Sequence, residues 1–380
     1  MGVSSSQASL LEALGHHQVV VCAGSGGVGK TTLACCLGIL LAQQGKKVLV
    51  LTIDPARRLA SALGLASDSA IGLAEVKVPG QNYAGELYAS MIDPQLVFDD
   101  FVQRRAPSPE AAERLMKNSL YRQLVGQLSG SQEFTSLERL LSAVESNRYD
   151  VVILDTPPTQ HAVDFLRAPE RIFALFQESV TKWFARRDPR ASPSGGVKKL
   201  LNQVVQRGTH TALKALEKIT GSAFVVELGD FFESMAALQS QVSGRSIEVH
   251  RLLTSERTGF LLVTGFDHSK LVEAKDFYGE LKRGGYSLSG IIVNRSQPSW
   301  LSLQSLDPSP LPSTPQMRDL LDLYQKLQRY YVLRQDVYGE FQAHLRGEVP
   351  YWLLPEIKGP VQGLEGLEQI SRVMSGERQK

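Results

Sequence analysis

The segment CAGSGGVGKTT, residues 22–32, carries the clearest candidate chemistry in this sequence. It satisfies two glycine patterns at once. As GxGxxG after an apolar run it fits a dinucleotide site, with Asp54 after the next apolar run as the carboxylate that would hold a ribose. As GxxxxGKT it fits a P-loop, whose backbone N–H groups, lysine and hydroxyl hold a nucleoside triphosphate and Mg²⁺.

The two patterns differ in the charge that they must neutralise. A dinucleotide brings a pyrophosphate against bare backbone, whereas a triphosphate with its metal also needs a lysine and a hydroxyl. Lys30 and Thr31 supply both, and the apolar run YDVVILD ends in Asp155, where a carboxylate would organise the Mg²⁺ shell. The segment therefore predicts ATP or GTP with Mg²⁺, rather than a dinucleotide or a merely structural glycine turn. The predicted nucleotide-binding residues here are Gly24, Ser25, Gly26, Gly27, Val28, Gly29, Lys30, Thr31 and Thr32, with Thr31 and Asp155 as metal ligands.

The elements that must position these residues are short apolar runs bounded by turn residues, which predict buried parallel strands. Helical stretches separate most of them, a pattern typical of an α/β fold with a doubly wound, mostly parallel sheet. The expected strands are Val19–Ala23, Val48–Ile53, Leu87–Ile92, Val151–Leu154, Phe260–Val263, Ile291–Val293 and, as a weaker seventh, Tyr351–Leu354.

Two helical stretches interrupt this strand rhythm. Apolar residues recur at helical spacing over Ile172–Phe184 and Phe224–Met235, with the loop-like RRDPRASPSGG between them. A further stretch runs from about Pro94 to Ser146. We expect a helical subdomain inserted into a nucleotide-binding core. The predicted core segments are 1–93, 147–165 and 251–380, and the predicted helical segments are 94–146 and 166–250.

The composition excludes several classes of protein. The 380 residues carry a net charge of +2, which argues against a nucleic-acid partner. No apolar run approaches the roughly 18–20 residues that span a bilayer, so we predict no transmembrane segment. The three cysteines, Cys22, Cys35 and Cys36, cannot form a disulfide framework, and we expect reduced, buried thiols in a cytoplasmic protein.

Three segments in this order, GSGGVGKTT, TIDPARRLASALG and LDTPPTQHAVDFL, resemble the ArsA family of ATPases. This family includes arsenite-pump ATPases and the targeting ATPases of tail-anchored membrane proteins. The resemblance covers Val19 to Leu166 and resumes near Phe260, where GIIVNR resembles the adenine-contacting strand end and GLEGLEQIS the closing helix. The helical part matches only in placement and size.

The resemblance implies roles for individual residues. Asp54 would orient the attacking water, although it could also only cap the helix that follows, with Pro55 at the first helical position. Asp155 through His161 would sense the γ-phosphate, although His161 could be an ordinary helix-face residue. Asn294 would hydrogen-bond adenine and favour ATP over GTP, or would only form a turn after its strand. Members of the family work as homodimers that close around two nucleotides.

This chain departs from the family pattern in the loop itself. The family usually has a lysine where Ser25 stands, and that lysine contacts phosphates across the dimer. We hypothesise that Arg57 or Arg58 partly replaces this cation, because guanidinium geometry suits phosphate. The alternative is two solvated charges on a helix face. The chain also lacks the CxxC zinc clip of eukaryotic targeting members and any cysteine after Cys36 that could bind arsenite.

The helical stretches could hold a hydrophobic helical client, as in the targeting members, or could simply pack their own core. We expect a slow, Mg²⁺-dependent ATPase whose nucleotide state moves the helical subdomain. One alternative is a nucleotide-gated binding protein with negligible hydrolysis. Another is a ParA/MinD-like positioning ATPase, which the short, weakly apolar tail ISRVMSGERQK and the near-neutral charge disfavour. The residues at issue in the client hypothesis are Met116, Trp183, Phe184, Phe224, Phe231, Phe232 and Met235.

Overall fold

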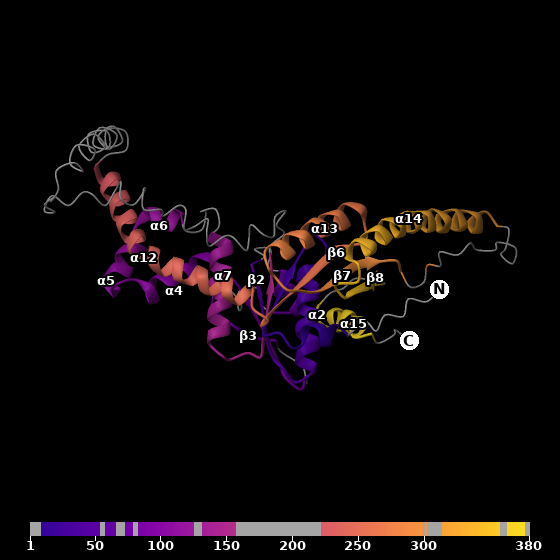
Figure 1. Ribbon diagram of the computed structural model, residues 1–380, viewed down its shortest axis with the longest axis horizontal. Coiled ribbons are helices and arrows are strands. Elements are labelled where there is room, and N and C mark those ends of the chain that lie inside the picture. Colours follow the sequence, from indigo (N-terminus) through magenta and orange to yellow (C-terminus); the bar gives the residue numbers. More distant parts are fainter. Residues whose placement is uncertain are drawn as a thin grey trace. The chain divides into compact units, whose positions relative to one another are not determined.

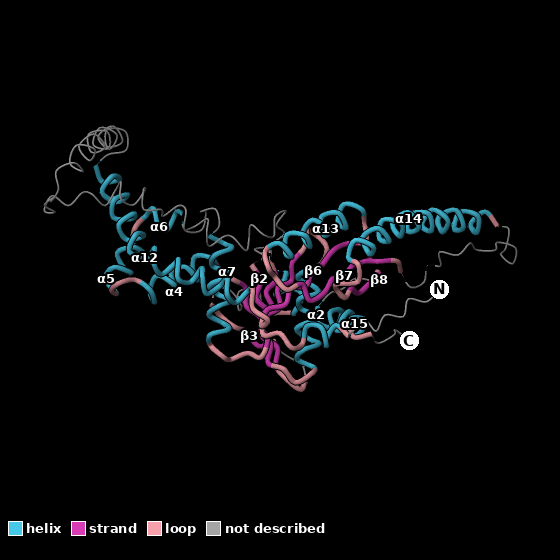
Figure 2. Tube along the Cα trace, in the orientation of Figure 1, coloured by secondary structure: helices cyan, strands magenta, loops and turns pink. Residues whose placement is uncertain are grey.

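The computed structural model describes residues 9–53, 58–65, 73–78, 83–124, 131–156, 222–298, 301, 314–357 and 363–376. The described residues fall into two compact units. Figures 1 and 2 show that the first contains the sheet with its helices and that the second is made of helices. The first unit takes in the described parts of Met1–Ile92, Arg139–Phe165 and His250–Lys380, and the second those of Asp93–Glu138 and Leu166–Val249.

The first unit is built on an eight-stranded sheet in the order β3-β4-β2-β5-β1-β6-β7-β8. Every neighbouring pair is parallel except β3 with β4. The seven expected strands are present and the predicted α/β fold is confirmed, while the short β3 had no recognisable sequence signal. The strands are β1 Val19–Ala23, β2 Lys47–Thr52, β3 Val76–Lys77, β4 Glu86–Met91, β5 Val151–Asp155, β6 Thr258–Gly265, β7 Leu288–Ser296 and β8 Tyr351–Pro355.

The central strand β1 is buried along its whole length because it lies between β5 and β6 and helices cover the sheet. Figure 1 shows α2 and α15 on one side of the sheet and α13 with α14 on the other. Since the neighbours of β1 run parallel to it, their carboxyl ends meet at one edge. The helices of this unit are α1 Leu10–Leu14, α2 Lys30–Gln43, α3 Arg58–Leu63, α13 His268–Arg283, α14 Pro315–Leu345 and α15 Gly363–Met374.

Helix α2 is apolar on all sides because it packs against both the sheet and α15. Ser371 of α15 donates its hydroxyl hydrogen to the carbonyl of Cys36, at 3.1 Å. All three cysteines are free and buried, as expected. Burial raises the pKa of Cys22 and Cys35 well above the usual thiol value and that of Cys36 to about 12. These thiols are therefore protonated and inert at neutral pH.

The second unit is helical and has its own apolar core. Aromatic rings dominate that core, with Phe101 and Phe134 edge to face at a centroid separation of 5.6 Å. Phe231 and Met235 of α12 are buried in the same core. This is the arrangement expected if these residues only pack the core of their own unit and do not hold a client. The helices are α4 Pro94–Arg105, α5 Pro109–Lys117, α6 Ser119–Leu124, α7 Ser131–Glu145 and α12 Ser222–Leu253, of which α7 and α12 run on into the first unit.

The predictions for the helical stretches can be compared with the structure only at the residues that it describes. Trp183 and Phe184 lie outside the described residues, as does the stretch Ile172–Phe184 as a whole. Within the parts that are described, no helix is both long enough and apolar enough to cross a membrane.

A buried histidine before β1 forms hydrogen bonds to residues near the starts of β6 and β7. His17 donates from Nδ1 to the carbonyl of Glu256 at 2.9 Å, and its Nε2 accepts from the Ser289 hydroxyl at 2.7 Å. Gly259 leaves room for the ring, because a Cβ there would lie 2.3 Å from His17 Cδ2. Burial lowers the pKa of His17 below its ordinary value of 6.5, a shift that the bond to Glu256 opposes and the neighbouring His16 assists.

This shift predicts a pH-dependent stability. The unfolded chain binds a proton at His17 near pH 6.5 while the folded chain resists it, so stability is lost as the pH falls below about 6.5. Between pH 7.5 and 5.5 the unfolding free energy should therefore fall more in the wild type than in His17→Gln. Urea titrations at both pH values measure this, with exposed His16→Gln as control. Equal drops in wild type and His17→Gln would contradict it.

Candidate functional site

The glycine-rich loop joins the end of β1 to the start of α2. Gly24, Gly27 and Gly29 have φ values of 148°, 77° and 95°, which favour glycine. A Cβ at Gly24 would lie 2.0 Å from the carbonyl oxygen of Val263, and one at Gly29 would lie 2.6 Å from Asn294 Nδ2. The loop therefore lies against β6 and β7 at a closeness that only glycine permits.

Helix α2 begins with its N-terminal N–H groups uncapped by any side chain among the described residues. Its N-cap, Gly29, is in the left-handed conformation, and the helix is 14 residues long. Free N–H groups and the positive end of the helix dipole make such a terminus suited to an anion. The loop and helix start thus form a cradle for phosphate groups.

Lys30, the first residue of α2, is 6% exposed. Its ammonium group donates to the carbonyl oxygen of Ser25 at 2.9 Å, so it lies across the loop. A buried cation held above a cradle of N–H groups suits a polyanion. Ser25 itself is neutral, and its hydroxyl oxygen is buried with no hydrogen-bond partner among the described residues.

The predicted metal ligands lie together at the carboxyl edge of the sheet. Asp155, 2% exposed, accepts hydrogen bonds at Oδ2 from the hydroxyl groups of Thr31, at 2.6 Å, and Thr52, at 2.8 Å. Hydroxyl and carboxylate oxygens are the ligands that Mg²⁺ prefers. The donor set therefore fits Mg²⁺ beside a triphosphate in the cradle.

Thr52 is a site residue that the sequence analysis missed. It ends β2, and the strand register places it directly beside Asp155 at the end of β5. In the sequence, Thr52 is recognisable only as a polar residue at the end of an apolar run. The strand order is needed to show that it lies beside Asp155.

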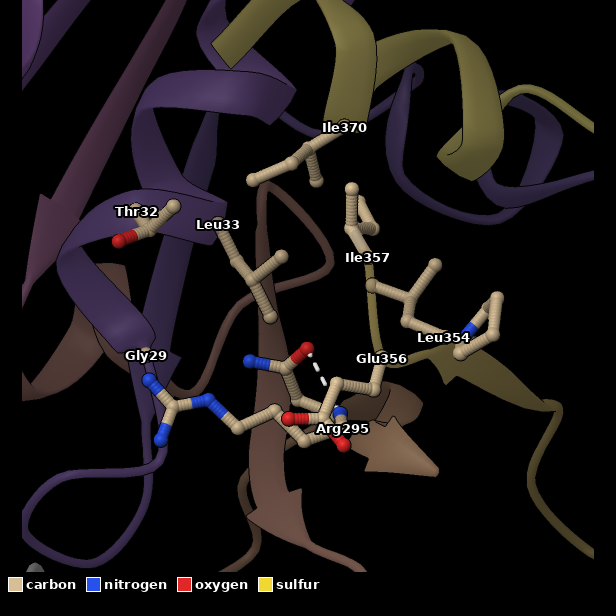
Figure 3. A pocket seen from close by; sticks show the side chains of 10 residues that line it. Gly29, Thr32, Leu33, Arg295, Leu354, Glu356, Ile357 and Ile370 are labelled. Atoms are coloured by element: carbon tan, nitrogen blue, oxygen red, sulfur yellow. Dashed lines mark hydrogen bonds between the residues drawn. The ribbon is translucent and has the colours of Figure 1, made fainter. Parts of the chain in front are cut away.

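A pocket of about 380 Å³ opens next to the first turn of α2 (Figure 3). Its surface is mostly polar, and apolar side chains from α2, the β8 end and α15 line the rest, a combination that suits a flat heterocycle with polar edges. Asn294 and Arg295 from β7 and Glu356 after β8 add polar groups. Of these residues, the sequence analysis predicted only Asn294, Gly29 and Thr32 as nucleotide contacts. The lining residues are Gly29, Thr32, Leu33, Asn294, Arg295, Leu354, Pro355, Glu356, Ile357 and Ile370.

Asn294 lies between the loop and this pocket. Its Nδ2 donates to the carbonyl oxygen of Val28 at 2.8 Å, and its Oδ1 accepts from the backbone N–H of Arg295 at 2.9 Å. Figure 3 marks the second of these bonds with a dashed line. A direct contact of Asn294 with adenine stays a prediction.

Other predicted residues cannot be placed at the site. Asp54 and Arg57 lie outside the described residues, and so does His161. Arg58 is the first residue of α3, and only its backbone is described. The roles of Asp54 and the two arginines therefore stay predictions.

The sequence is similar to those of known ATPases over most of its length. A family model described as anion-transporting ATPase, ArsA, matches residues 17–376. ATPase GET3 of Podospora anserina is 28% identical over 354 residues, which cover 92% of this chain and 88% of that protein. A putative arsenical pump-driving ATPase of Aquifex aeolicus is 23% identical over 95% of this chain and 79% of its own length.

A third relative matches over a shorter range. ATPase GET3 of Malassezia globosa is 32% identical over 164 residues, and the match spans 43% of this chain and 45% of that protein. The family model, in contrast, extends over nearly the whole chain, and its matched range contains the loop, Asp155 and the pocket. The chain therefore belongs to the ArsA family of ATPases, and it is an ATPase.

Proposed function

We propose that this protein binds Mg²⁺ and ATP at the loop between β1 and α2 and uses hydrolysis as a conformational switch. The observation that carries the proposal is the convergence of Lys30, Thr31 and Asp155 on one edge of the sheet. These residues supply the cation, the hydroxyl and the carboxylate that a triphosphate with its metal requires.

Phosphate binding follows from the loop and the start of α2. The uncapped N–H groups of α2 would donate hydrogen bonds to the phosphate oxygens, and the loop glycines bring the backbone close enough for this. The Lys30 ammonium, which donates to the Ser25 carbonyl in this structure, would donate to the negatively charged phosphate oxygens. Because the group is buried, this attraction is screened less than it would be in water.

Metal binding follows from the Thr31 hydroxyl. Its oxygen can bind Mg²⁺ while its hydrogen still points to Asp155 Oδ2, the bond already present. Thr52 holds the same carboxylate oxygen from the other strand end and so fixes its orientation. Bound Mg²⁺ would neutralise charge that develops on the phosphate oxygens.

The hydrolytic step needs a water-orienting group and a cation. We propose Asp54 for the water and Arg57 or Arg58 for the cation, because the neutral Ser25 cannot bring positive charge to a developing phosphate anion. Support for this assignment comes from the family resemblance of the segment TIDPARR.

The switch would act through a homodimer that closes around two nucleotides and changes the apolar surface of the helical unit. Support comes from the family membership and from the apolar core of that unit, which could open toward a hydrophobic helix. The buried, protonated thiols are in keeping with work in the cytoplasm.

The decisive variant of the site is Lys30→Ala. Removing the buried ammonium should lower the rate of ATP hydrolysis at least about a hundredfold, the cost typical of losing one charge-stabilising contact. Steady-state phosphate release with Mg²⁺ measures it. Lys282→Ala, at an exposed lysine paired with Glu348, is the control and should keep full activity.

Two outcomes of this experiment would change the proposal. Wild-type protein that binds ATP but releases no phosphate above the rate without protein would be a nucleotide-gated binding protein. Equal turnover of all three proteins above that background rate would exclude the loop as the site.

The cation hypothesis predicts that Arg57→Ala or Arg58→Ala lowers kcat about tenfold or more while ATP binding changes little, because the charge acts on the transition state. Turnover and equilibrium binding are measured for each single variant. A loss of no more than twofold in both variants would refute the hypothesis.

The client hypothesis predicts that nucleotide changes the exposed apolar surface. A dye that fluoresces in apolar surroundings should bind differently to the ATP and ADP states of wild-type protein. In Lys30→Ala the difference should vanish. A dye signal that ignores nucleotide in the wild type would contradict a nucleotide-gated apolar surface.

A further inference from the structure

Asn294 makes a contact with the loop that a role in base recognition does not require. It lies in β7, directly after the predicted strand Ile291–Val293, and its side chain reaches the loop and donates to the carbonyl oxygen of Val28 at 2.8 Å. A carbonyl oxygen only accepts hydrogen bonds, so this end of the amide must be the NH₂ group. The residues are 266 positions apart in the sequence.

This contact sets the direction of the next backbone N–H along the chain, which belongs to Gly29. A trans peptide is planar, and its C=O and N–H point in opposite directions. Holding the Val28 carbonyl toward Asn294 therefore turns the N–H of Gly29 away from Asn294. Gly29 is the N-cap of α2, so this N–H belongs to the anion cradle.

Two further features keep the contact in place. Asn294 Oδ1 accepts from the N–H of Arg295 at 2.9 Å, which fixes the plane of the amide. Arg295 has a φ of 53°, a left-handed conformation that is uncommon outside glycine. Gly29 leaves the space that the amide occupies, since a Cβ there would lie 2.6 Å from Nδ2.

We propose that Asn294 is a positioning residue for the triphosphate: it holds the Val28–Gly29 peptide in the orientation that presents the Gly29 N–H to a phosphate oxygen. This role is separate from any contact with the base. It rests on the proposed function only in that the cradle binds a triphosphate. The second N–H of the same amide remains for the pocket, so one side chain joins the two halves of the site.

The test compares a ligand with a base to one without. Binding of ATP and of inorganic tripolyphosphate, each with Mg²⁺, is measured by calorimetry for wild type, Asn294→Leu and Asn294→Ala. Leucine matches the size of asparagine without a donor or a charge. Loss of a well-oriented N–H to a charged oxygen should raise the Kd for tripolyphosphate about tenfold.

The matched control is Ile357→Ala, which lines the pocket but is apolar and cannot hydrogen-bond the loop through its side chain. It should weaken ATP binding and leave the Kd for tripolyphosphate within twofold. If the Asn294 variants also weaken only ATP, the residue serves the base alone and the proposal is wrong. If wild type and Lys30→Ala bind tripolyphosphate equally poorly, the proposed nucleotide site fails instead.

A second measurement covers the case in which neither Asn294 variant folds, as judged by circular dichroism. In wild-type protein labelled with ¹⁵N-glycine, tripolyphosphate should shift the Gly29 amide proton downfield, as a new bond to an anion does. The Gly45 amide, in the turn between α2 and β2, is the internal reference. An unshifted Gly29 resonance at saturating tripolyphosphate would overturn the proposal.

Discussion

The whole site depends on the absence of side chains at Gly24 and Gly29. The loop lies so close to β6 and β7 that a Cβ at either position would overlap a carbonyl oxygen or the Asn294 amide. This closeness gives the loop its shape, because the neighbouring strands support it from behind. It also leaves the opposite side of the backbone open, so N–H groups can face an anion. A methyl group at either position would separate the loop from its support and change the direction of those N–H groups.

The site contains buried charged side chains, but the burial of charge alone does not identify a ligand-binding site. Asp155 and Lys30 are almost fully buried, and both accept or donate hydrogen bonds to neutral groups: Asp155 accepts from two hydroxyl groups, and Lys30 donates to a carbonyl oxygen. In the second unit, Glu138 and Arg245 are equally buried and lie 2.8 Å apart. In that pair each side chain compensates the charge of the other. At the loop, the hydroxyl and carbonyl groups beside Asp155 and Lys30 are neutral groups that a metal or a phosphate could displace.

The apolar residues of the helical unit have two candidate roles, namely packing the core of the unit and binding a hydrophobic partner. Phe231 and Met235 are buried with Phe101 and Phe134, so in this structure they stabilise the unit itself. If Phe231 and Met235 are to contact a hydrophobic partner, that core must rearrange, at the cost of exposing apolar area. Nucleotide binding is the source of free energy that such a rearrangement could use, which is why the switch and the client belong to one proposal.

Seven strands and the glycine-rich loop could be located from the sequence alone, and its residue types predict the chemistry of a triphosphate site. Apolar runs with turn residues at their ends located seven strands, and the spacing of glycines, Lys30 and Thr31 identified the loop, because local patterns encode local structure. Tertiary structure alone decided which distant residues complete the site. Thr52 reaches Asp155 because β2 lies beside β5, and Asn294 reaches Val28 because β7 lies two strands from β1. The pocket likewise needs β8 and α15 beside the start of α2. No local pattern contains the order of strands in a sheet, since that order follows from packing between segments far apart in the chain.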